Sequence, residues 1–311
     1  MTIDRRKFLR TTAIVAAVSG FTSSRGESMY KEIPVTKNDR ALKKMPIGVI
    51  ASADNPEEDL RIVKDMGFSV CQLNISEYSS ELAKRLSDTL SKYQIHPSTL
   101  ICMGPGEHKY NFIDGPSSIG LVPCRNREAR VERLRQGIDF CKTVGIPAVH
   151  AHFGFIPEDP KNILYIEFIE TMRKLGEYGL LQGIDFYFES GQETPITLLR
   201  AIEDIGTGNM FVNYDTANLA MYGKANPFDG LKVLSKYVKA FHAKDGMYPT
   251  IPYELGKEVP IPEGVVDFPK VFEYLKEIDF TGEIIIECEM SGQQKDYILT
   301  TKKYLEGLIL S

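Results

Sequence analysis

Short apolar runs rich in β-branched and aromatic residues alternate with longer amphipathic stretches along most of the chain. Apolar runs of about 4–8 residues are typical of buried strands, whereas the longer stretches have the period of a helix. Strands are predicted at residues 46–52, 69–75, 96–103, 148–153, 185–189, 210–215, 238–244 and 283–287. Helices are predicted at residues 56–66, 80–93, 126–144, 162–182, 195–205, 268–278 and 296–310.

The regular alternation of strands and helices predicts an α/β fold with a parallel sheet. Eight strands with helical sequence between them favour a single (β/α)8 TIM barrel. An open, doubly wound sheet is the alternative, although no G-x-G-x-x-G or P-loop motif follows a predicted strand. Several glycines precede predicted strands, where the end of a helix favours a left-handed residue. They are Gly67, Gly145, Gly183 and Gly282.

The beginning of the chain has a different pattern. Arg5 and Arg6 precede an apolar run at about residues 11–21, which is too short to span a membrane. This pattern predicts a twin-arginine export signal at residues 1–30, a linker at residues 31–44 and the barrel domain at residues 45–311. We therefore expect a protein of the periplasm or cell envelope, with no stable membrane span after export. A basic N-terminus with a chance apolar stretch is the alternative.

The composition is that of a globular chain, with 43% hydrophobic and 25% charged residues. There are 37 Lys and Arg against 42 Asp and Glu, a net charge of −5, and no long basic run. A nucleic-acid partner is therefore disfavoured. The five cysteines are odd in number and form no C-x-x-C pair. We expect free thiols, most of them buried, and no disulfide framework or zinc site.

Four residues with side chains that can bind a metal lie at the ends of the last four predicted strands. They are Glu189, Asp215, His242 and Glu287. Because the carboxyl ends of the strands meet at one mouth of a TIM barrel, we expect these side chains to converge. Such an oxygen-rich set favours Mn²⁺, with Mg²⁺, Co²⁺ or Zn²⁺ as alternatives. Glu289 shares the parity of Glu287 and is the alternative ligand, and four unrelated strand-end residues are the alternative to any site.

Two further strands carry candidates for substrate binding. His150 and His152 lie two residues apart on the predicted fourth strand and therefore share a face. We expect His152, nearer the strand end, to bind substrate, and His150 to be a satisfied histidine of the barrel interior. Lys244 shares the parity of His242 and is expected to bind substrate, with a Schiff base as the alternative. Asp245 is expected to support Lys244 or to pair with it.

The motifs around these residues resemble those of the sugar phosphate isomerase/epimerase superfamily, the xylose isomerase-like TIM barrels. The resemblance extends from about residue 45 to the C-terminus. It rests on His242-Ala243-Lys244-Asp245, on Tyr214-Asp215-Thr216, on the segments that end at Glu189 and Glu287, and on Gly264-Val265-Val266-Asp267-Phe268. Many members carry a histidine three residues after the aspartate, where this chain has Asn218. We expect Asn218 to bind substrate, with contacts that differ from those of the sugar epimerases.

The resemblance implies that the four strand-end residues bind one divalent cation and that Glu189 and Glu287 are the acid and the base. Such a site moves a proton next to a carbonyl through an enediolate. We therefore expect an isomerase or epimerase of a free sugar, a keto-sugar or a glycoside derivative. A lyase or dehydratase with the same metal site, or a non-catalytic carbohydrate-binding barrel, is the alternative, and a metallohydrolase is disfavoured. The expected partner is a small carbohydrate, and a homo-oligomer is compatible with this interpretation.

Overall fold

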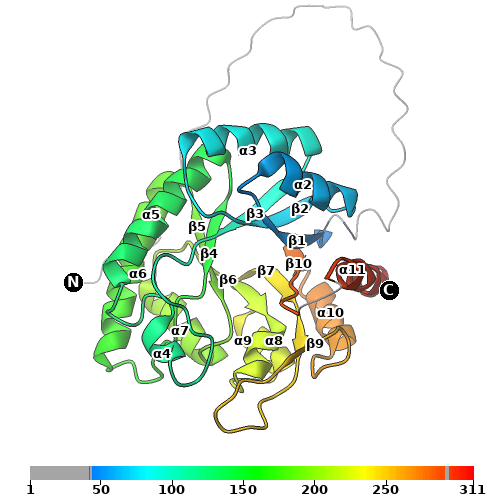
Figure 1. Ribbon diagram of the computed structural model, residues 1–311. Coiled ribbons are helices and arrows are strands. Elements are labelled where there is room, and N and C mark those ends of the chain that lie inside the picture. The colour runs from blue at the N-terminus through cyan, green and yellow to red at the C-terminus, as the bar shows by residue number, and fades with distance from the viewer. Residues whose placement is uncertain (1–41, 43, 291–293) are drawn as a thin grey trace, which may run out of the picture. The chain divides into compact units, whose positions relative to one another are not determined.

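Parallel strands close into a barrel at the centre of the molecule (Figure 1). Within the described part of the chain, the hydrogen-bonded order is β1-β10-β7-β6-β5-β4-β3-β2. The strands are β1 (Ile47–Ser52), β2 (Val70–Asn74), β3 (His96–Ile101), β4 (Ala148–Ala151), β5 (Asp185–Glu189), β6 (Met210–Asp215), β7 (Val238–Ala243) and β10 (Glu283–Ile286). This closed barrel confirms the predicted TIM barrel and excludes the open sheet.

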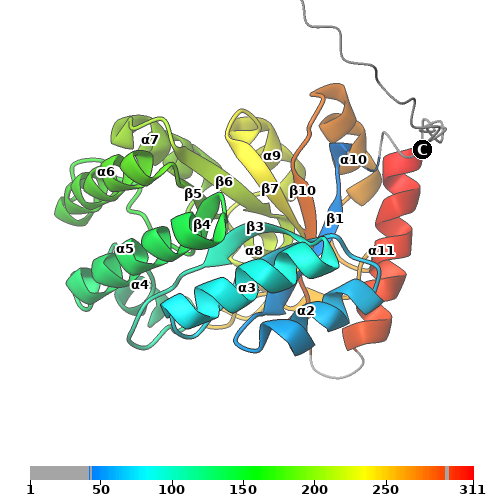
Figure 2. The ribbon, with the colours of Figure 1, turned by 90° about the horizontal axis from the view of Figure 1, so that it is seen from above.

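The structure is a computed structural model that describes residues 42, 44–290 and 294–311. The predicted export signal, and all but two residues of the predicted linker, lie outside the described residues. Helices ring the barrel (Figures 1 and 2). They are α2 (Pro56–Asp65), α3 (Ser80–Tyr93), α5 (Arg127–Val144), α6 (Ile163–Gln182), α7 (Pro195–Ile205), α9 (Pro227–Leu234), α10 (Phe268–Glu277) and α11 (Gln294–Leu310). Among the described residues, no helix is both long enough and apolar enough to cross a bilayer.

Four short elements in the loops, together with α9, were not predicted. The loop elements are α4 (Gly115–Ser118), α8 (Thr216–Met221), β8 (Asp245–Gly246) and β9 (Glu258–Val259). Each is too short to show a hydrophobic period. Helix α9 contains Gly230, which weakens its helical propensity. A Cβ atom at Gly230 would lie 2.6 Å from the hydroxyl of Tyr214, so close packing requires glycine there.

Side chains alternate along the strands as predicted. Phe186 and Phe188 of β5 are buried in the apolar layer between barrel and helices, and the intervening Tyr187 packs inside the barrel with Ala148 and Ala240. Glycines at three helix ends also have the predicted left-handed backbone, at Gly67, Gly145 and Gly183. Gly282 does not. A Cβ atom there would lie 2.0 Å from the carbonyl oxygen of Lys239, so close approach of two backbones explains this glycine.

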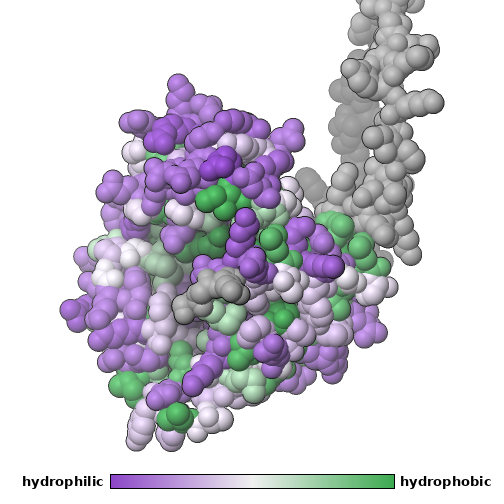
Figure 3. Space-filling model, turned by 45° about the vertical axis from the view of Figure 1, so that its right-hand side comes forward, coloured by the Kyte–Doolittle hydropathy of each residue, from purple (hydrophilic) through white to green (hydrophobic). Residues whose placement is uncertain are grey.

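The cysteines are free thiols, as predicted. Cys71, Cys102 and Cys141 are buried, Cys288 is half-buried and Cys124 is exposed. Hydrophobic side chains on the face shown in Figure 3 are scattered among hydrophilic ones. The described surface of that face therefore resembles an ordinary protein surface.

Two buried charged residues fix the long loops around the barrel mouth. Arg130 of α5 donates to the carbonyl oxygens of Pro105, Gly120 and Glu107, at 2.9, 2.7 and 3.2 Å. It thereby holds the loop between β3 and α5. Asp245 accepts hydrogen bonds from the backbone N–H groups of Gly246, Gly264 and Val266, at 2.9, 2.8 and 3.2 Å. Asp245 therefore anchors the loop after β7, and among the described residues no ion pair joins it to Lys244, contrary to one expectation.

Candidate functional site

Four residues from four neighbouring strand ends meet at the mouth of the barrel. We call them the carboxylate–histidine cluster: Glu189, Asp215, His242 and Glu287. Glu189 and Asp215 are the last residues of β5 and β6, His242 lies one residue before the end of β7, and Glu287 follows β10. One potential ligand atom from each residue lies within 4.8 Å of the others. The structure thus brings together the four residues that the sequence suggested as metal ligands.

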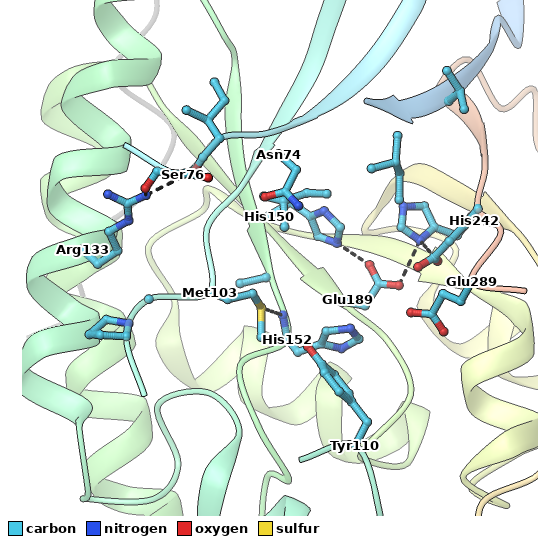
Figure 4. Close-up of a pocket in the computed structure, with 18 of the residues that line it drawn as sticks. Asn74, Ser76, Met103, Tyr110, Arg133, His150, His152, Glu189, His242 and Glu289 are labelled. Atoms are coloured by element: carbon cyan, nitrogen blue, oxygen red, sulfur yellow. Dashed lines mark hydrogen bonds and ion pairs between the residues drawn. The ribbon is translucent and has the colours of Figure 1, made fainter. Parts of the chain in front are cut away.

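The Nδ1 atom of His242 faces the three carboxylates of this cluster, and Figure 4 shows its contact with Glu189. It is 2.7 Å from Oε2 of Glu287 and 3.0 Å from Oε1 of Glu189. Oδ2 of Asp215 is 3.7 Å away. The side chain of His242 is 1% exposed and that of Asp215 is fully buried, whereas that of Glu287 is 14% exposed. One ring nitrogen therefore faces three carboxylates in a nearly closed space.

Three of these atoms are buried and make no hydrogen bond of good geometry within the described residues: Nδ1 of His242, Oδ2 of Asp215 and Oε2 of Glu287. Nδ1 of His242 and Oε2 of Glu287 contact each other only as an ion pair, at 2.7 Å. An unsatisfied buried polar atom costs about 1–3 kcal/mol, and more if it is charged. A divalent cation bound to the cluster would satisfy all three atoms at once. Carboxylate oxygens with one imidazole nitrogen suit Mn²⁺ or Mg²⁺, and no sulfur is present to favour a structural zinc. The donor set therefore fits a divalent cation.

Electrostatics show how the cluster balances its charge in the metal-free protein. Burial raises the pKa of Asp215 well above its usual value. Burial lowers the pKa of His242, but the carboxylates of Glu189 and Glu287 outweigh this effect and raise it. Both directions favour protons on the imidazole and on Asp215, which would reduce the repulsion between the carboxylates. A bound cation would replace these protons, so metal binding should release protons to solvent.

Glu287, and not Glu289, belongs to the cluster. Glu289 is 64% exposed, and its Oε2 atom lies 3.0 Å from Nζ of Lys244. Its backbone N–H donates to the carboxylate of Glu258, 3.1 Å away. Glu289 therefore lies beside the cluster, next to Lys244, while Glu287 points into it.

His150 lies closer to the site than the sequence suggested. It is buried, and its Nε2 atom contacts Oε2 of Glu189 (Figure 4). The same oxygen accepts a hydrogen bond from Nδ2 of Asn213 at 2.7 Å. His150 is thus in the barrel interior, as expected, but its Nδ1 atom has no partner among the residues that the structure describes, so it is not fully satisfied. The sequence indicated this position of His150 only through its spacing, since it lies two residues before His152 and therefore on the same face of the strand.

The expected substrate-binding residues separate into two groups. His152 lines the cavity above the cluster, whereas Lys244 and Asn218 do not. Lys244 is 1% exposed, with Nζ 3.5 Å from Oε1 of Glu287. Nδ2 of Asn218 lies 3.5 Å from Oε1 of Glu189, and its backbone N–H donates to Oδ1 of Asp215 at 2.7 Å. In this geometry Lys244 and Asn218 contact cluster residues, and only His152 faces substrate space.

His152 and Lys244 differ in charge. Burial lowers the pKa of His152, so its imidazole is neutral. Its Nδ1 atom lies 3.0 Å from the amide nitrogen of Gln192, a residue that the sequence analysis did not single out. Burial lowers the pKa of Lys244, but Glu287 and Asp215 raise it above its usual value. Because a Schiff base requires a neutral amine, this charged state disfavours that alternative for Lys244.

A cavity of about 940 Å³ opens above the cluster. It extends from Glu189 and His242 past Met103 to α5, so that Arg133 lies across the cavity from His242 (Figure 4). We call its far end the α5 arm, lined by Ser76, Tyr78, Ala129, Glu132, Arg133 and Gln136. This volume is near the upper end of the range for sites that hold drug-sized ligands, about 300–1,000 Å³. The cavity is therefore larger than one sugar ring requires.

The α5 arm has a rigid and electrically balanced wall. The guanidinium of Arg133 lies 3.5 Å from the ring centroid of Tyr78. Its Nη2 atom donates to the carbonyl oxygens of Ile75 and Ser76 at 3.2 and 2.7 Å. Glu132 lines the same arm, and its negative charge offsets the positive charge of Arg133. Such a wall suits a neutral hydroxylated group better than an anion.

Comparison with known proteins identifies the family. The profile of the family described as xylose isomerase-like TIM barrel matches residues 60–308. An uncharacterized protein of Methanocaldococcus jannaschii is 27% identical over 194 residues, which are 58% of this chain and 64% of the relative. The chain thus spans somewhat less than two thirds of that relative's length.

Solved structures show the same barrel. A xylose isomerase domain protein from Planctomyces limnophilus is 28% identical, with a TM-score of 0.79 over 85% of this chain and 97% of its own. A D-tagatose 3-epimerase-like protein is 21% identical, with a TM-score of 0.67 over 85% and 97%.

More distant structures have TM-scores of 0.59–0.65 at 14–18% identity, covering 81–85% of this chain and 87–98% of theirs. They are an L-ribulose 3-epimerase, a probable 3-DHS dehydratase from Bacillus anthracis and a Mycobacterium smegmatis barrel in complex with magnesium. At these identities the likeness shows the fold alone.

Proposed function

Because this chain belongs to the family of xylose isomerase-like TIM barrels, we propose that it is an exported, divalent-metal-dependent isomerase or epimerase of a keto-sugar or keto-glycoside. The convergence of four potential ligand atoms, one from each member of the carboxylate–histidine cluster and all within 4.8 Å of one another, carries the proposal. They meet at the barrel mouth, beside a large cavity, where active sites of this fold lie. Epimerases among the structural neighbours, and a neighbour in complex with magnesium, support it.

The cluster would hold the cation, Mn²⁺ in our proposal, which would polarise the substrate carbonyl and offset the negative charge that develops on its oxygen. Glu287 lines the cavity and directs Oε2 at His242, so in this proposal Oε1, which lies 3.5 Å from Nζ of Lys244, removes a proton from the carbon next to the carbonyl. Glu189 also lines the cavity and supplies a second carboxylate. His152, neutral and bonded at Nδ1 to Gln192, would bind a substrate oxygen through Nε2.

One observation favours a second candidate, a lyase that eliminates water or an alcohol with a single base. Oε2 of Glu189 already contacts His150 and accepts from Asn213, whereas Oε1 of Glu287 has only Lys244 beside it, at 3.5 Å. Epimerisation needs acid–base groups on both faces of the carbon, whereas elimination can use one. The dehydratase among the structural neighbours is compatible with this outcome.

The sequence pattern at the N-terminus supports the exported location in this proposal. Arg5 and Arg6 before a short apolar run support export by the twin-arginine route to the periplasm or cell envelope. Phosphorylated sugars are chiefly intracellular. An exported enzyme would therefore act on free sugars or glycosides, which agrees with the neutral wall of the α5 arm.

Solvent exchange tests the proposed function directly. Protein reconstituted with Mn²⁺ is incubated in heavy water with a panel of ketoses and 3-keto-glycosides, and products and deuterium uptake are followed by NMR. We expect deuterium at the carbon next to the carbonyl in the substrate that turns over. Product without deuterium and without a primary isotope effect at that carbon would exclude the enediolate route. Metal-loaded protein that turns over no member of the panel would favour a carbohydrate-binding barrel.

A further inference from the structure

We infer that Gln72 of β2 is a positioning residue that fixes the imidazole of His242 with its Nδ1 lone pair directed at the cation. This inference rests on the proposed metal site. Gln72 is fully buried inside the barrel, and β1 and β10 separate its strand from β7. Its side chain nevertheless reaches His242, with Oε1 2.8 Å from Nε2 of the imidazole.

Gln72 belongs to a chain of buried hydrogen bonds that crosses the barrel. Nε2 of Gln72 donates to Oδ1 of Asn213 on β6 at 2.9 Å. Nδ2 of Asn213 in turn donates to Oε2 of Glu189 at 2.7 Å. This chain of hydrogen bonds, which we call the amide relay, thus connects His242 to Glu189 through the side-chain amides of Gln72 and Asn213.

The donor and acceptor groups of the amide relay allow only one direction for each of its hydrogen bonds. An ionised carboxylate only accepts, so Asn213 must present its NH₂ group to Glu189 and its carbonyl oxygen to Gln72. Gln72 must then present its NH₂ group to Asn213 and its carbonyl oxygen to His242. A carbonyl oxygen also only accepts, so Nε2 of His242 must carry a proton. In the neutral imidazole that leaves Nδ1 unprotonated.

The position of the proton on His242 matters for the carboxylate–histidine cluster. Nδ1 faces the carboxylates of Glu189, Asp215 and Glu287, so an unprotonated nitrogen there is favourable only beside a cation. Gln72 therefore prepares His242 for metal binding. Partners that orient a metal-binding histidine typically contribute about 10–100-fold in metal affinity.

Replacement of Gln72 by methionine tests the inference. Gln72→Met keeps the length of the side chain but removes the acceptor for Nε2 of His242. We expect Mn²⁺ affinity, measured by competition with a chelator, to fall about 10–100-fold. Gln192→Met is the matched control, because Gln192 is equally buried in the same site but contacts His152 and no cluster residue in the described structure. Its Mn²⁺ affinity should stay within about twofold of the wild type.

A second variant and a spectroscopic measurement separate positioning from packing. Gln72→Glu retains an acceptor for His242 but loses the donor to Oδ1 of Asn213, so it should bind Mn²⁺ more tightly than Gln72→Met. In wild-type protein loaded with diamagnetic Zn²⁺, the ¹⁵N NMR shifts of His242 should show a protonated Nε2 and a coordinated Nδ1. Coordination through Nε2, or equal Mn²⁺ affinity of Gln72→Met and the wild type, would overturn the inference. Neither readout requires a sugar substrate, so failure to find turnover leaves this test intact.

Discussion

Glu287 directs Oε2 at Nδ1 of His242, 2.7 Å away, and its other oxygen at Lys244. That second oxygen, Oε1, lies 3.5 Å from the ammonium of Lys244. One carboxylate thus offers one atom to a cation and another to substrate or to Lys244. Metal binding and proton transfer by this residue can therefore be separated experimentally.

Glu287→Gln should separate them. The amide keeps an oxygen for the cation but cannot accept a proton from carbon, so turnover should fall by roughly 10²-fold or more, the usual scale of general acid–base catalysis. Metal affinity should fall much less. The measurements are kcat on the identified substrate and Mn²⁺ affinity by chelator competition. Glu289→Gln is the control, since Glu289 lies outside the cluster, and it should leave metal binding nearly intact. Unchanged turnover in Glu287→Gln would contradict a catalytic role.

Asp215 is predicted to be essential for metal. Its Oδ2 atom faces the cluster without a partner in the described structure, whereas Oδ1 caps α8 by accepting from the backbone of Asn218. Asp215→Asn retains its oxygen for the cap, so its NH₂ group takes the place of Oδ2 and leaves the cation neither an oxygen nor a negative charge. We expect metal content after reconstitution with Mn²⁺ to fall to a small fraction of the wild type.

Elemental analysis and thermal melting of the metal-free proteins check this prediction about Asp215. Melting within a few degrees of the wild type would show that the cap is retained, because loss of an N-cap costs about 0.5–2 kcal/mol. Asp215→Ala removes both functions and should lower both metal content and melting temperature. Wild-type metal content in either variant would exclude Asp215 as a ligand.

The barrel was predictable because its strands are buried on both faces. Such strands are nearly continuous apolar runs, and β5 and β6 have the predicted bounds, residues 185–189 and 210–215. The convergence of the four strand-end residues followed from the rule that the carboxyl ends of barrel strands meet at one mouth. Local pattern and global topology therefore agree for the fold and for the candidate ligands.

Contacts between segments that lie far apart in the sequence were not predictable in this way. Gln72 lies within an apolar run, and nothing in its local sequence shows that its amide reaches His242 across the barrel. Arg133 reads as one more charged residue of an amphipathic helix, yet its position on α5 places it at the cavity. The role of Asp245 depends on Gly264, nineteen residues away, where a Cβ atom would lie 2.1 Å from its carboxylate. Such partners are set by tertiary packing, which period and propensity do not encode.

The α5 arm predicts a preference for substrates with two rings. Ala129 is a small residue that lines the arm. Ala129→Trp should fill the arm and lower kcat/KM for a 3-keto-disaccharide by about tenfold or more, the scale of 1–3 kcal/mol of lost contacts. Activity on a single-ring ketose should change by less than about twofold. Glu128→Trp is the control, because the neighbouring Glu128 is exposed and does not line the cavity. Equal losses on both substrates would exclude a separate subsite.

Export is testable without any substrate. Replacement of both Arg5 and Arg6 by lysine keeps the positive charge but removes the twin-arginine pair. We expect this variant to accumulate in the cytoplasm, while the wild type reaches the periplasmic fraction, as followed by cell fractionation and immunoblotting. Replacement of Lys7 by arginine, next to the pair, is the control and should leave export unchanged. Undiminished export of the double variant would refute the twin-arginine route.

The last prediction concerns Glu193, a buried glutamate in the loop after β5 that is 4% exposed. Burial raises its pKa to about 8 from a usual value of 4.5, and Lys224 offsets only part of this effect. Between these two values the native protein holds a proton that the unfolded chain has released. The free energy of unfolding contributed by this group therefore falls as pH rises from about 4.5 to 8.

Glu193→Gln cannot ionise, so it should lose this dependence. The variant should match the wild type near pH 4.5 and exceed it at pH 8 by a few kcal/mol, since each unit of pKa shift corresponds to about 1.4 kcal/mol. Urea unfolding of the metal-free proteins at several pH values measures the difference between variant and wild type, which cancels the titration of all other groups. Glu203→Gln, on the exposed side of α7, is the control for the exchange of a glutamate for a glutamine. A constant difference for Glu193→Gln would show that the pKa of Glu193 in the native protein equals that in the unfolded chain, and that Lys224 or solvent compensates for its burial.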